Sequence, residues 1–168
     1  MSVSPMIRPV SLKDAPAIAA IYNPYIRETV ITFEEEAVSA GEIEKRIQNI
    51  LSLGYPYLVM ELEKRVIAYA YAGQWRSRSA YRHTVETSIY LERSLTGKGL
   101  GSTLYQALLN EIRKLDIHIV LGGITLPNPA SVRLHEKLGF KKVAHFNEAG
   151  YKFGQWLDVG FWQLSLPV

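Results

Sequence analysis

The sequence contains a glycine-rich segment whose residue types and spacing favour binding of an anion. It runs Thr96-Gly97-Lys98-Gly99-Leu100-Gly101-Ser102 and directly precedes a long stretch with helical periodicity. Glycines at the start of a helix let backbone N–H groups approach a ligand, and the helix N-terminus adds partial positive charge. We therefore expect this loop to hold a diphosphate, with Lys98 adding a full charge. A flexible turn before a helix is the structural alternative.

Two common nucleotide-binding loops do not fit this spacing. A P-loop ends in Gly-Lys followed by Ser or Thr, whereas Gly99 follows Lys98 here. A dinucleotide fingerprint needs a third glycine where Ser102 stands, and it usually follows the first strand of a βαβ unit. The spacing therefore points to a diphosphate-containing ligand of another kind.

A second candidate is Glu86, in an alternating strand pattern over Thr84–Leu91. An unpaired carboxylate among apolar residues is costly, so its presence calls for a reason. A carboxylate beside an attacking amine can orient the ammonium group and accept its proton, directly or through water. The alternation alone is equally consistent with an ordinary carboxylate on a solvent-facing side of the strand.

A basic loop, Trp75-Arg76-Ser77-Arg78-Ser79-Ala80-Tyr81-Arg82, comes just before that strand. The guanidinium groups of Arg76 and Arg78 match carboxylates or phosphinates through paired N–H groups, and Tyr81 could form a wall. His135, on the helix that Asn128 is expected to cap, could supply a proton at neutral pH. The alternatives are a solvated basic loop and a partly buried structural histidine.

Composition narrows the possible classes of protein. The 168 residues include 19 Lys or Arg, 16 Asp or Glu and no cysteine, for a net charge of +3. The missing cysteines exclude thiolate metal sites, disulfides and an acyl-cysteine intermediate. No secretory signal, membrane-length apolar run or metal-ligand spacing is visible, and His83, His118 and His145 are expected to be structural. We expect a cytoplasmic protein with one domain over residues 1–168, no metal, and no nucleic-acid or membrane partner.

The elements that would position these residues follow from periodicity and capping signals. Ser11 and Asp14 predict a helix start; Pro24 should bend or end that helix, and residues 27–38 read as a loop. A second helix is expected from Ser39 to near Gly54. Later helices are expected over Leu100–Leu115 and from Asn128 to Gly139, and strands over Met6–Val10, Tyr57–Leu62, Val66–Trp75, Thr84–Leu91, Ile117–Leu121, Phe140–Phe146 and Asp158–Leu166. The order β-α-α-β-β-β-α-β-α-β-β predicts an α/β fold with a mixed sheet of about seven strands and about four helices.

The chain resembles the GNAT superfamily of N-acetyltransferases, and within it the phosphinothricin and methionine sulfoximine N-acetyltransferases. The matching stretches are YAGQWRSRSAY, TVETSIYL, TGKGLGSTLY, PNPASVRLHEKLGF and DVGFWQLSLP, which span most of the chain after residue 55. Thr96 stands where the superfamily usually has Gln or Arg, which removes one phosphate-facing side chain. The resemblance implies the GNAT fold, acetyl-CoA as co-substrate and a homodimer.

The resemblance also implies roles for individual residues. It places the pantetheine arm along Ile89, Tyr90 and Leu91, and the thioester end of the cofactor near Asn128. It makes Glu86 a substrate-contacting residue or the base, acting directly or through water. It also gives His135 the proton for the departing thiolate and lets Phe33 and its flanking loop close the pocket. The implied diphosphate-binding residues are Gly97, Lys98, Gly99, Leu100, Gly101 and Ser102. The implied substrate-binding residues are Arg76, Ser77, Arg78, Tyr81, Glu86, Thr87 and Ser88.

We therefore expect direct transfer of an acetyl group from acetyl-CoA to the α-amine of a small amino-acid analogue, in a ternary complex. One alternative is a protein or peptide N-acetyltransferase, although the arginine loop argues against basic peptides. Another is a non-catalytic acyl-CoA-binding module. Phe161 and Trp162 in the last strand could belong either to the core or to a subunit interface.

Overall fold

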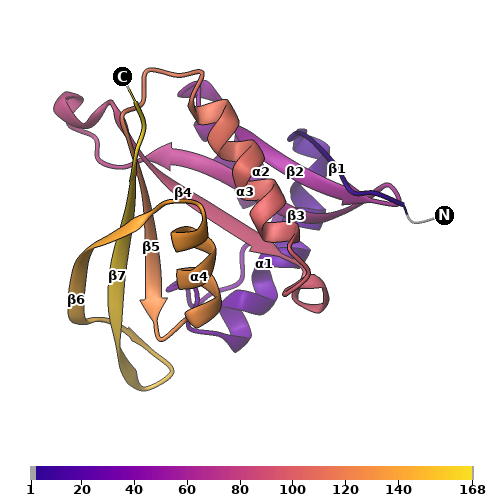
Figure 1. Ribbon diagram of the computed structural model, residues 1–168. Coiled ribbons are helices and arrows are strands. Elements are labelled where there is room, and N and C mark those ends of the chain that lie inside the picture. Colours follow the sequence, from indigo (N-terminus) through magenta and orange to yellow (C-terminus); the bar gives the residue numbers. More distant parts are fainter. Residues whose placement is uncertain (1–2, 168) are drawn as a thin grey trace. The chain divides into compact units, whose positions relative to one another are not determined.

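The computed structural model describes residues 3–167, which form seven strands and four α-helices in the predicted order (Figure 1). The helices are α1 (Ala15–Glu28), α2 (Ala40–Ser52), α3 (Leu100–Ile112) and α4 (Pro129–Lys137). The strands are β1 (Met6–Pro9), β2 (Tyr57–Leu62), β3 (Arg65–Gln74), β4 (Thr84–Leu91), β5 (Ile119–Leu126), β6 (Lys141–Lys152) and β7 (Gln155–Ser165). They form one sheet in the order β1-β2-β3-β4-β5-β7-β6. Because β4 and β5 pair in parallel while β5 and β7 pair antiparallel, the predicted mixed sheet is confirmed.

The described residues group into two compact units. The first contains the chain up to Asn23, together with Val38–Gly73 and Ser88–Leu115. The second contains Pro24–Ala37, Gln74–Thr87 and the chain from Asp116 onward. Strand β4 contributes residues to both units. The expectation of one domain over residues 1–168 stays a prediction.

The core of the first unit forms around β2. Four consecutive residues of this strand, Tyr57–Met60, are buried, so both of its faces are covered. Helices α2 and α3 both pack on β2. Of the apolar stripe expected for the helix over Leu100–Leu115, Leu104, Leu108 and Ile112 are fully buried. Each such side chain contributes roughly 1.5–3 kcal/mol by leaving water. The helix ends at Ile112 rather than residue 115, and Leu115 is 36% exposed.

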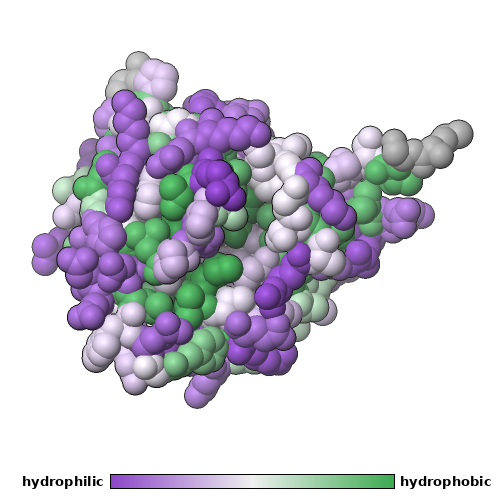
Figure 2. All heavy atoms as spheres, turned by 60° about the horizontal axis from the view of Figure 1, so that its bottom comes forward, coloured by the Kyte–Doolittle hydropathy of each residue, from purple (hydrophilic) through white to green (hydrophobic). Residues whose placement is uncertain are grey.

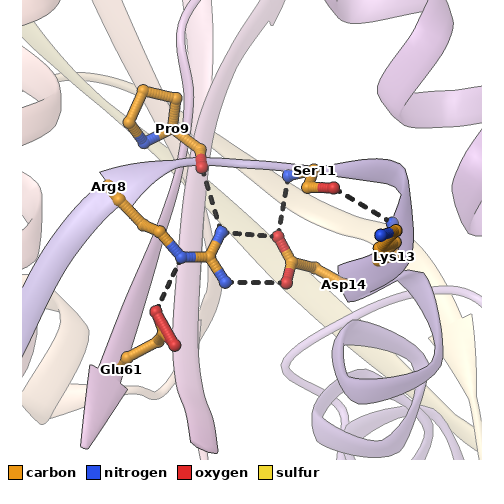
Figure 3. Close-up of polar contacts among 6 residues, drawn as sticks. All are labelled: Arg8, Pro9, Ser11, Lys13, Asp14 and Glu61. Atoms are coloured by element: carbon orange, nitrogen blue, oxygen red, sulfur yellow. Dashed lines mark hydrogen bonds and ion pairs between the residues drawn. The ribbon is translucent and has the colours of Figure 1, made fainter. Parts of the chain in front are cut away.

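The start of the chain is fixed by an ion-pair network around Arg8 (Figure 3). The guanidinium donates two 2.8 Å hydrogen bonds to the carboxylate of Asp14 and a third, of 2.6 Å, to Glu61 on β2. Asp14 also accepts from the backbone N–H of Ser11, so these two residues form a capping box at the predicted helix start. Hydrogen bonding from Arg8 lowers the pKa of Asp14. The network therefore anchors β1 against β2 rather than forming part of a reactive site.

The second unit presents two chemically different faces of the strands β5, β7 and β6. Residues paired directly across strands share a face, and successive residues alternate between faces. Gly122 pairs with Trp162, and Gly123 pairs with Phe161, so the two pairs lie on opposite faces. Helix α4 covers the first of these, where the Trp162 indole donates a 3.3 Å hydrogen bond to Glu136 (Figure 1). We call these the α4 face and the Phe161 face.

Several elements differ from the sequence-based expectations. Strand β5 continues to Leu126 rather than ending at residue 121, and β6 continues to Lys152 rather than ending at residue 146. Strand β7 begins at Gln155 rather than residue 158 because it pairs with the longer β6. Helix α1 runs through Pro24 to Glu28, so the proline does not end it.

The surface mixes polar and apolar residues. On the face shown in Figure 2, hydrophilic residues surround smaller hydrophobic areas, as on most folded proteins. Among the described residues, no helix has both the length and the apolar character needed to cross a bilayer.

Candidate active site

Glu86 lies on the Phe161 face of the second unit. It is paired with Leu121 on β5, and its Oε1 atom is 3.2 Å from the point where a Cβ of Gly123 would stand. Two ring carbons of Phe161 lie 3.2 and 3.3 Å from the same point. The carboxylate therefore rests over a residue that has no side chain, beside an aromatic ring.

The electrostatic environment of Glu86 favours a proton acceptor. Burial raises the pKa of its carboxyl group above the ordinary value of 4.5, and burial is the only cause of this shift. No cation within residues 3–167 offsets the cost of its charge. An ammonium group bound beside this carboxylate would stabilise its negative charge. Because its pKa is raised, the carboxylate would also accept a proton more readily than an exposed carboxylate.

The arginine loop forms a pocket of about 400 Å³, lined by Arg76, Ser77, Arg78 and Tyr81. The Arg76 guanidinium carbon lies 5.2 Å from the centre of the Trp75 ring and 5.9 Å from that of Tyr81. These distances are within the range of cation–π attraction, which restrains the guanidinium. The pocket is therefore basic, with an aromatic wall as predicted for Tyr81.

Aromatic rings connect the basic pocket to the surroundings of Glu86. The Trp75 ring meets the Phe161 ring edge-on, with centroids 5.4 Å apart and planes at 72°. Phe161 in turn flanks the Glu86 carboxylate at Gly123. Sequence reasoning missed Trp75 and Phe161 as site residues. The period-2 alternation of β7, which separates Phe161 from Trp162, is the signal that could have found Phe161. Trp162 itself is only 2% exposed and belongs to the core.

His135 lies on the α4 face, away from Glu86. It is 5% exposed, and its Nε2 atom is 2.5 Å from the point where a Cβ of Gly122 would stand. Its Nδ1 atom is 2.8 Å from the carbonyl oxygen of Ser131, which can only accept, so Nδ1 carries a hydrogen. Burial lowers the pKa of His135 despite that hydrogen bond. A neutral ring of this tautomer has no proton on Nε2, and proton donation from Nε2 would first require its protonation.

Other residues expected at the substrate, and Asn128, expected at the cofactor, have different surroundings. Thr87 points away from Glu86, is 8% exposed, and donates a 3.3 Å hydrogen bond to the carbonyl of Leu121. It therefore helps hold β4 to β5. Asn128 caps α4 by accepting a 3.2 Å hydrogen bond from the backbone N–H of Ser131, as predicted. Ser88 is half-buried and belongs to the first unit.

The first unit contains the glycine loop, and its geometry fits an anion. Gly97 and Gly99 have φ values of +78° and +79°, which favour glycine, and an added Cβ would meet nothing within 4 Å at either. Gly99 is the N-cap of α3 and offers no side-chain cap. The first helical bond runs from the Thr103 N–H to Gly99, which leaves the N–H groups of residues 100–102 without an acceptor in the helix. A diphosphate could accept from these groups.

Residues 89–91, expected along the pantetheine arm, are half-buried at the end of β4. The ring of Tyr90 packs against Tyr22 and Tyr69, with centroids 4.9 and 5.6 Å apart. That side chain therefore belongs to a tyrosine cluster of the first unit. The three remaining histidines each contact an oxygen: His83 that of the Asp116 backbone, His118 that of the Leu166 backbone, and His145 the Asp158 carboxylate.

Comparison with known proteins agrees with these observations. Residues 7–160 match the family model described as acetyltransferase (GNAT) domain. Phosphinothricin N-acetyltransferase of Streptomyces viridochromogenes is 41% identical over 162 residues, covering 96% of this chain and 88% of its own length. The L-methionine sulfoximine/L-methionine sulfone acetyltransferase of Salmonella typhimurium is 39% identical, covering 95% and 94%. The crystal structure of a GNAT superfamily phosphinothricin acetyltransferase from Sinorhizobium meliloti, in complex with acetyl-CoA, has a TM-score of 0.93, 36% identity, and coverage of 99% and 89%.

Proposed function

The chain belongs to the GNAT family of acetyltransferases, and we propose that it transfers the acetyl group of acetyl-CoA to the α-amine of a small amino-acid analogue of the phosphinothricin or methionine sulfoximine type. The relatives named for these activities cover nearly the whole chain. The reaction joins the amine nitrogen to the acetyl carbonyl carbon, breaks the thioester carbon–sulfur bond, and releases CoA as a thiol carrying the proton that the amine gives up.

The observation that carries the proposal is the unpaired, partly buried carboxylate of Glu86 over Gly123. An amino-acid ammonium would supply the cation that this carboxylate lacks. Glu86 would then orient the ammonium group and accept one of its protons, which frees the nitrogen lone pair for attack. The second N–H proton leaves with CoA as the thiol. General-base assistance of this kind typically contributes about 10²–10⁴-fold in rate.

The basic pocket supports an amino acid with an anionic or strongly polar group besides its α-amine. Arg76 and Arg78 would bind its carboxylate or its phosphinate or sulfoximine group, with Tyr81 as a wall of the pocket. The Trp75 ring would restrain the Arg76 guanidinium. We call the adjacent rings of Trp75 and Phe161 the aromatic row. Holding the polar groups of the substrate at the arginine end of this row and the amine at Glu86 would orient the nucleophile. Such orientation can lower the barrier by several kcal/mol.

For acetyl-CoA, the open backbone of the glycine loop supports the binding of the diphosphate. The N–H groups of residues 100–102 and the charge of Lys98 would hold the phosphates at the N-terminus of α3. Strand β4 carries both Glu86 and residues 89–91, so one strand supplies residues proposed for both substrates. A backbone N–H near Leu91 would stabilise negative charge developing on the thioester oxygen. Proton donation by His135 stays a prediction.

We also propose that the protein acts in the cytoplasm as a homodimer. The β6–β7 hairpin supports the dimer because two of its aromatic residues, Tyr151 and Trp156, are 55% and 65% exposed and pack together with centroids 4.7 Å apart. Clustered exposed rings are typical of association surfaces. Sedimentation or light scattering would measure the mass directly, and a monomer at micromolar concentration would contradict this part of the proposal.

Release of CoA tests the proposed function. The wild-type protein should release CoA with phosphinothricin or methionine sulfoximine, and much more slowly with peptides or without an amine. Arg78→Ala should raise the KM for these substrates roughly tenfold while the KM for acetyl-CoA stays unchanged. Arg82→Ala is the matched control, because the Arg82 guanidinium bonds to the Ser79 carbonyl and does not line the pocket. Binding of acetyl-CoA without turnover would favour a non-catalytic module.

A further inference from the structure

A fully buried lysine lies on β6, outside the groups used so far. Lys152 is only 1% exposed, and its Nζ donates a 2.7 Å hydrogen bond to the backbone carbonyl of Thr32. The ammonium also lies 5.0 Å from the centre of the Phe153 ring. Burying an ammonium group is expensive unless its partners are well placed. Its hydrogen-bond partner, the Thr32 carbonyl, lies in the loop of residues 29–37 that follows α1. The buried ammonium therefore fixes this loop to β6.

The same loop makes a second close contact with β6. The ring of Phe33 lies over Gly150, where three of its atoms would be 2.3, 2.5 and 3.0 Å from an added Cβ. The ring can take this position only because residue 150 has no side chain. Phe33 is nevertheless 40% exposed, so one side of the ring remains available for another contact.

Residues 29–37 make contacts at their start and further along. The Thr29 hydroxyl donates a 2.7 Å hydrogen bond to the Tyr25 carbonyl, which fixes the loop to the end of α1. Further along, the Thr32 carbonyl is fixed by Lys152 and the ring of Phe33 by Gly150. Lys152 and Gly150, both on β6, therefore hold the loop in place, and we call these two residues the seat of the loop.

The seat lies on the same sheet face as Glu86. Gly150 pairs with Leu157 and Lys152 with Gln155, and along β7 the residues Gln155, Leu157 and Phe161 share a face by alternation. Phe161 pairs with Gly123, over which the Glu86 carboxylate rests. The loop with Phe33 and the proposed amine site therefore occupy one face of the second unit.

We propose that Lys152 is a positioning residue for substrate recognition: by holding the Thr32 carbonyl, it fixes Phe33 as a wall of the amino-acid site. The exposed side of the ring would contact the apolar part of the substrate side chain. This inference rests on the proposed function and adds a determinant of amino-acid specificity.

Steady-state kinetics of three single variants test the assignment. Lys152→Met keeps an unbranched side chain of nearly the same length but removes the ammonium, and Phe33→Ala removes the ring. Gly150→Ala keeps both but displaces the ring. Each should raise the KM for methionine sulfoximine roughly tenfold while the KM for acetyl-CoA changes less than about twofold. Equal changes in both KM values, or an unchanged KM for the amino acid, would overturn the proposal.

Double variants separate positioning from general damage to the fold. If Lys152 and Gly150 act through the ring, then Lys152→Met and Gly150→Ala should add almost nothing to Phe33→Ala. Independent, multiplying effects would contradict the proposal. Gly150→Ala keeps the test available if Lys152→Met does not fold, because its φ lies outside the region that favours glycine.

Hydrogen exchange gives a readout that does not depend on catalysis. In Lys152→Met, the amides of residues 31–35 should exchange faster than in the wild type, while those of α3 should be unchanged. Unchanged exchange in the loop would overturn the inference even if the enzyme acetylates amino acids. A wild-type protein without amino-acid turnover would instead refute the proposed function, so the two failures can be told apart.

Discussion

Glu86 and His135 lie on opposite faces of β5, where their side chains end against the consecutive residues Gly123 and Gly122. The carboxylate is on the Phe161 face, near the aromatic row that leads to the arginine pocket. The imidazole is on the α4 face and is packed edge-on against Phe140, with centroids 5.1 Å apart. The two residues therefore cannot pass a proton directly to one another. Removal of the amine proton and any proton donation by His135 must be separate events.

The first prediction concerns the acidic side of the pH–activity profile. Because burial raises the pKa of Glu86, kcat/KM for the amino acid should fall as the pH is lowered, with a midpoint above the ordinary value of 4.5. Glu86→Gln should lower kcat by about 10²–10⁴-fold and remove this pH dependence. Its affinity for acetyl-CoA, measured by calorimetry, should match the wild type. Wild-type turnover in Glu86→Gln across the pH range would refute the role of Glu86 as the base.

The second prediction is that the same substitution does not destabilise the protein. The pKa of Glu86 is higher in the folded protein than in the unfolded chain. As the pH rises, the unfolded chain therefore releases the carboxyl proton at a lower pH than the folded protein does. Stability is therefore lost as the pH rises from about 4.5 through the folded-state pKa. At pH 7, Glu86→Gln should melt at the same temperature as the wild type or higher. A clearly lower Tm at pH 7 would mean that the carboxylate makes a stabilising interaction in the folded protein.

The third prediction separates the two interpretations of His135. The ring is buried, so His135→Ala should leave a cavity beside Gly122 and cost about 1–3 kcal/mol. The folded-state pKa is lowered, so wild-type stability should fall as the pH drops below about 6.5, and the variant should lose this dependence. If the role is structural, kcat measured well below Tm should fall less than about tenfold, because general acid–base catalysis usually contributes about 10²-fold or more. A larger loss of kcat at unchanged stability would establish proton donation.

Glycines explain much of the difference between the predicted and observed elements. In a sequence, glycines such as Gly122 and Gly150 are typical of turns and strand ends. The predicted strands that became β5 and β6 therefore end before these glycines, whereas the observed strands continue through them. In the fold, Gly122 makes room for the His135 ring, Gly123 for the Glu86 carboxylate and Gly150 for the Phe33 ring. Such close approaches depend on residues far away in the chain, and local periodicity carries no information about them.

The residues around the candidate site also divide into those indicated by local sequence features and those that depend on contacts between distant parts of the chain. The alternation of β4 and the basic loop made Glu86, Arg76 and Arg78 candidates because these features are local. A solvent-facing carboxylate and a solvated basic loop stayed open until the family resemblance was added. The aromatic row and the buried Lys152 result from pairing between distant strands and from a contact between residues 32 and 152. Sequence alone could not separate Thr87 from Ser88 as substrate contacts, since burial decides which of them is accessible.

The fourth prediction concerns the diphosphate loop. Gly99 and Gly154 have similar φ values, +79° and +74°, and neither would place a Cβ within 4 Å of another atom. Alanine should therefore cost about 1–2 kcal/mol of stability at either position. Only Gly99→Ala should also raise the KM for acetyl-CoA, roughly tenfold, because it distorts the N-cap of α3. Equal KM values in the two variants would argue against phosphate binding at this loop.

The most direct measurement is a crystal structure of the wild-type protein with CoA and methionine sulfoximine bound together. We predict that the α-amino nitrogen lies about 3 Å from the Glu86 carboxylate, on the Phe161 face, with the acidic groups of the substrate at Arg76 and Arg78. An amine bound on the α4 face beside His135, or a Glu86 carboxylate that the substrate does not approach, would contradict the account.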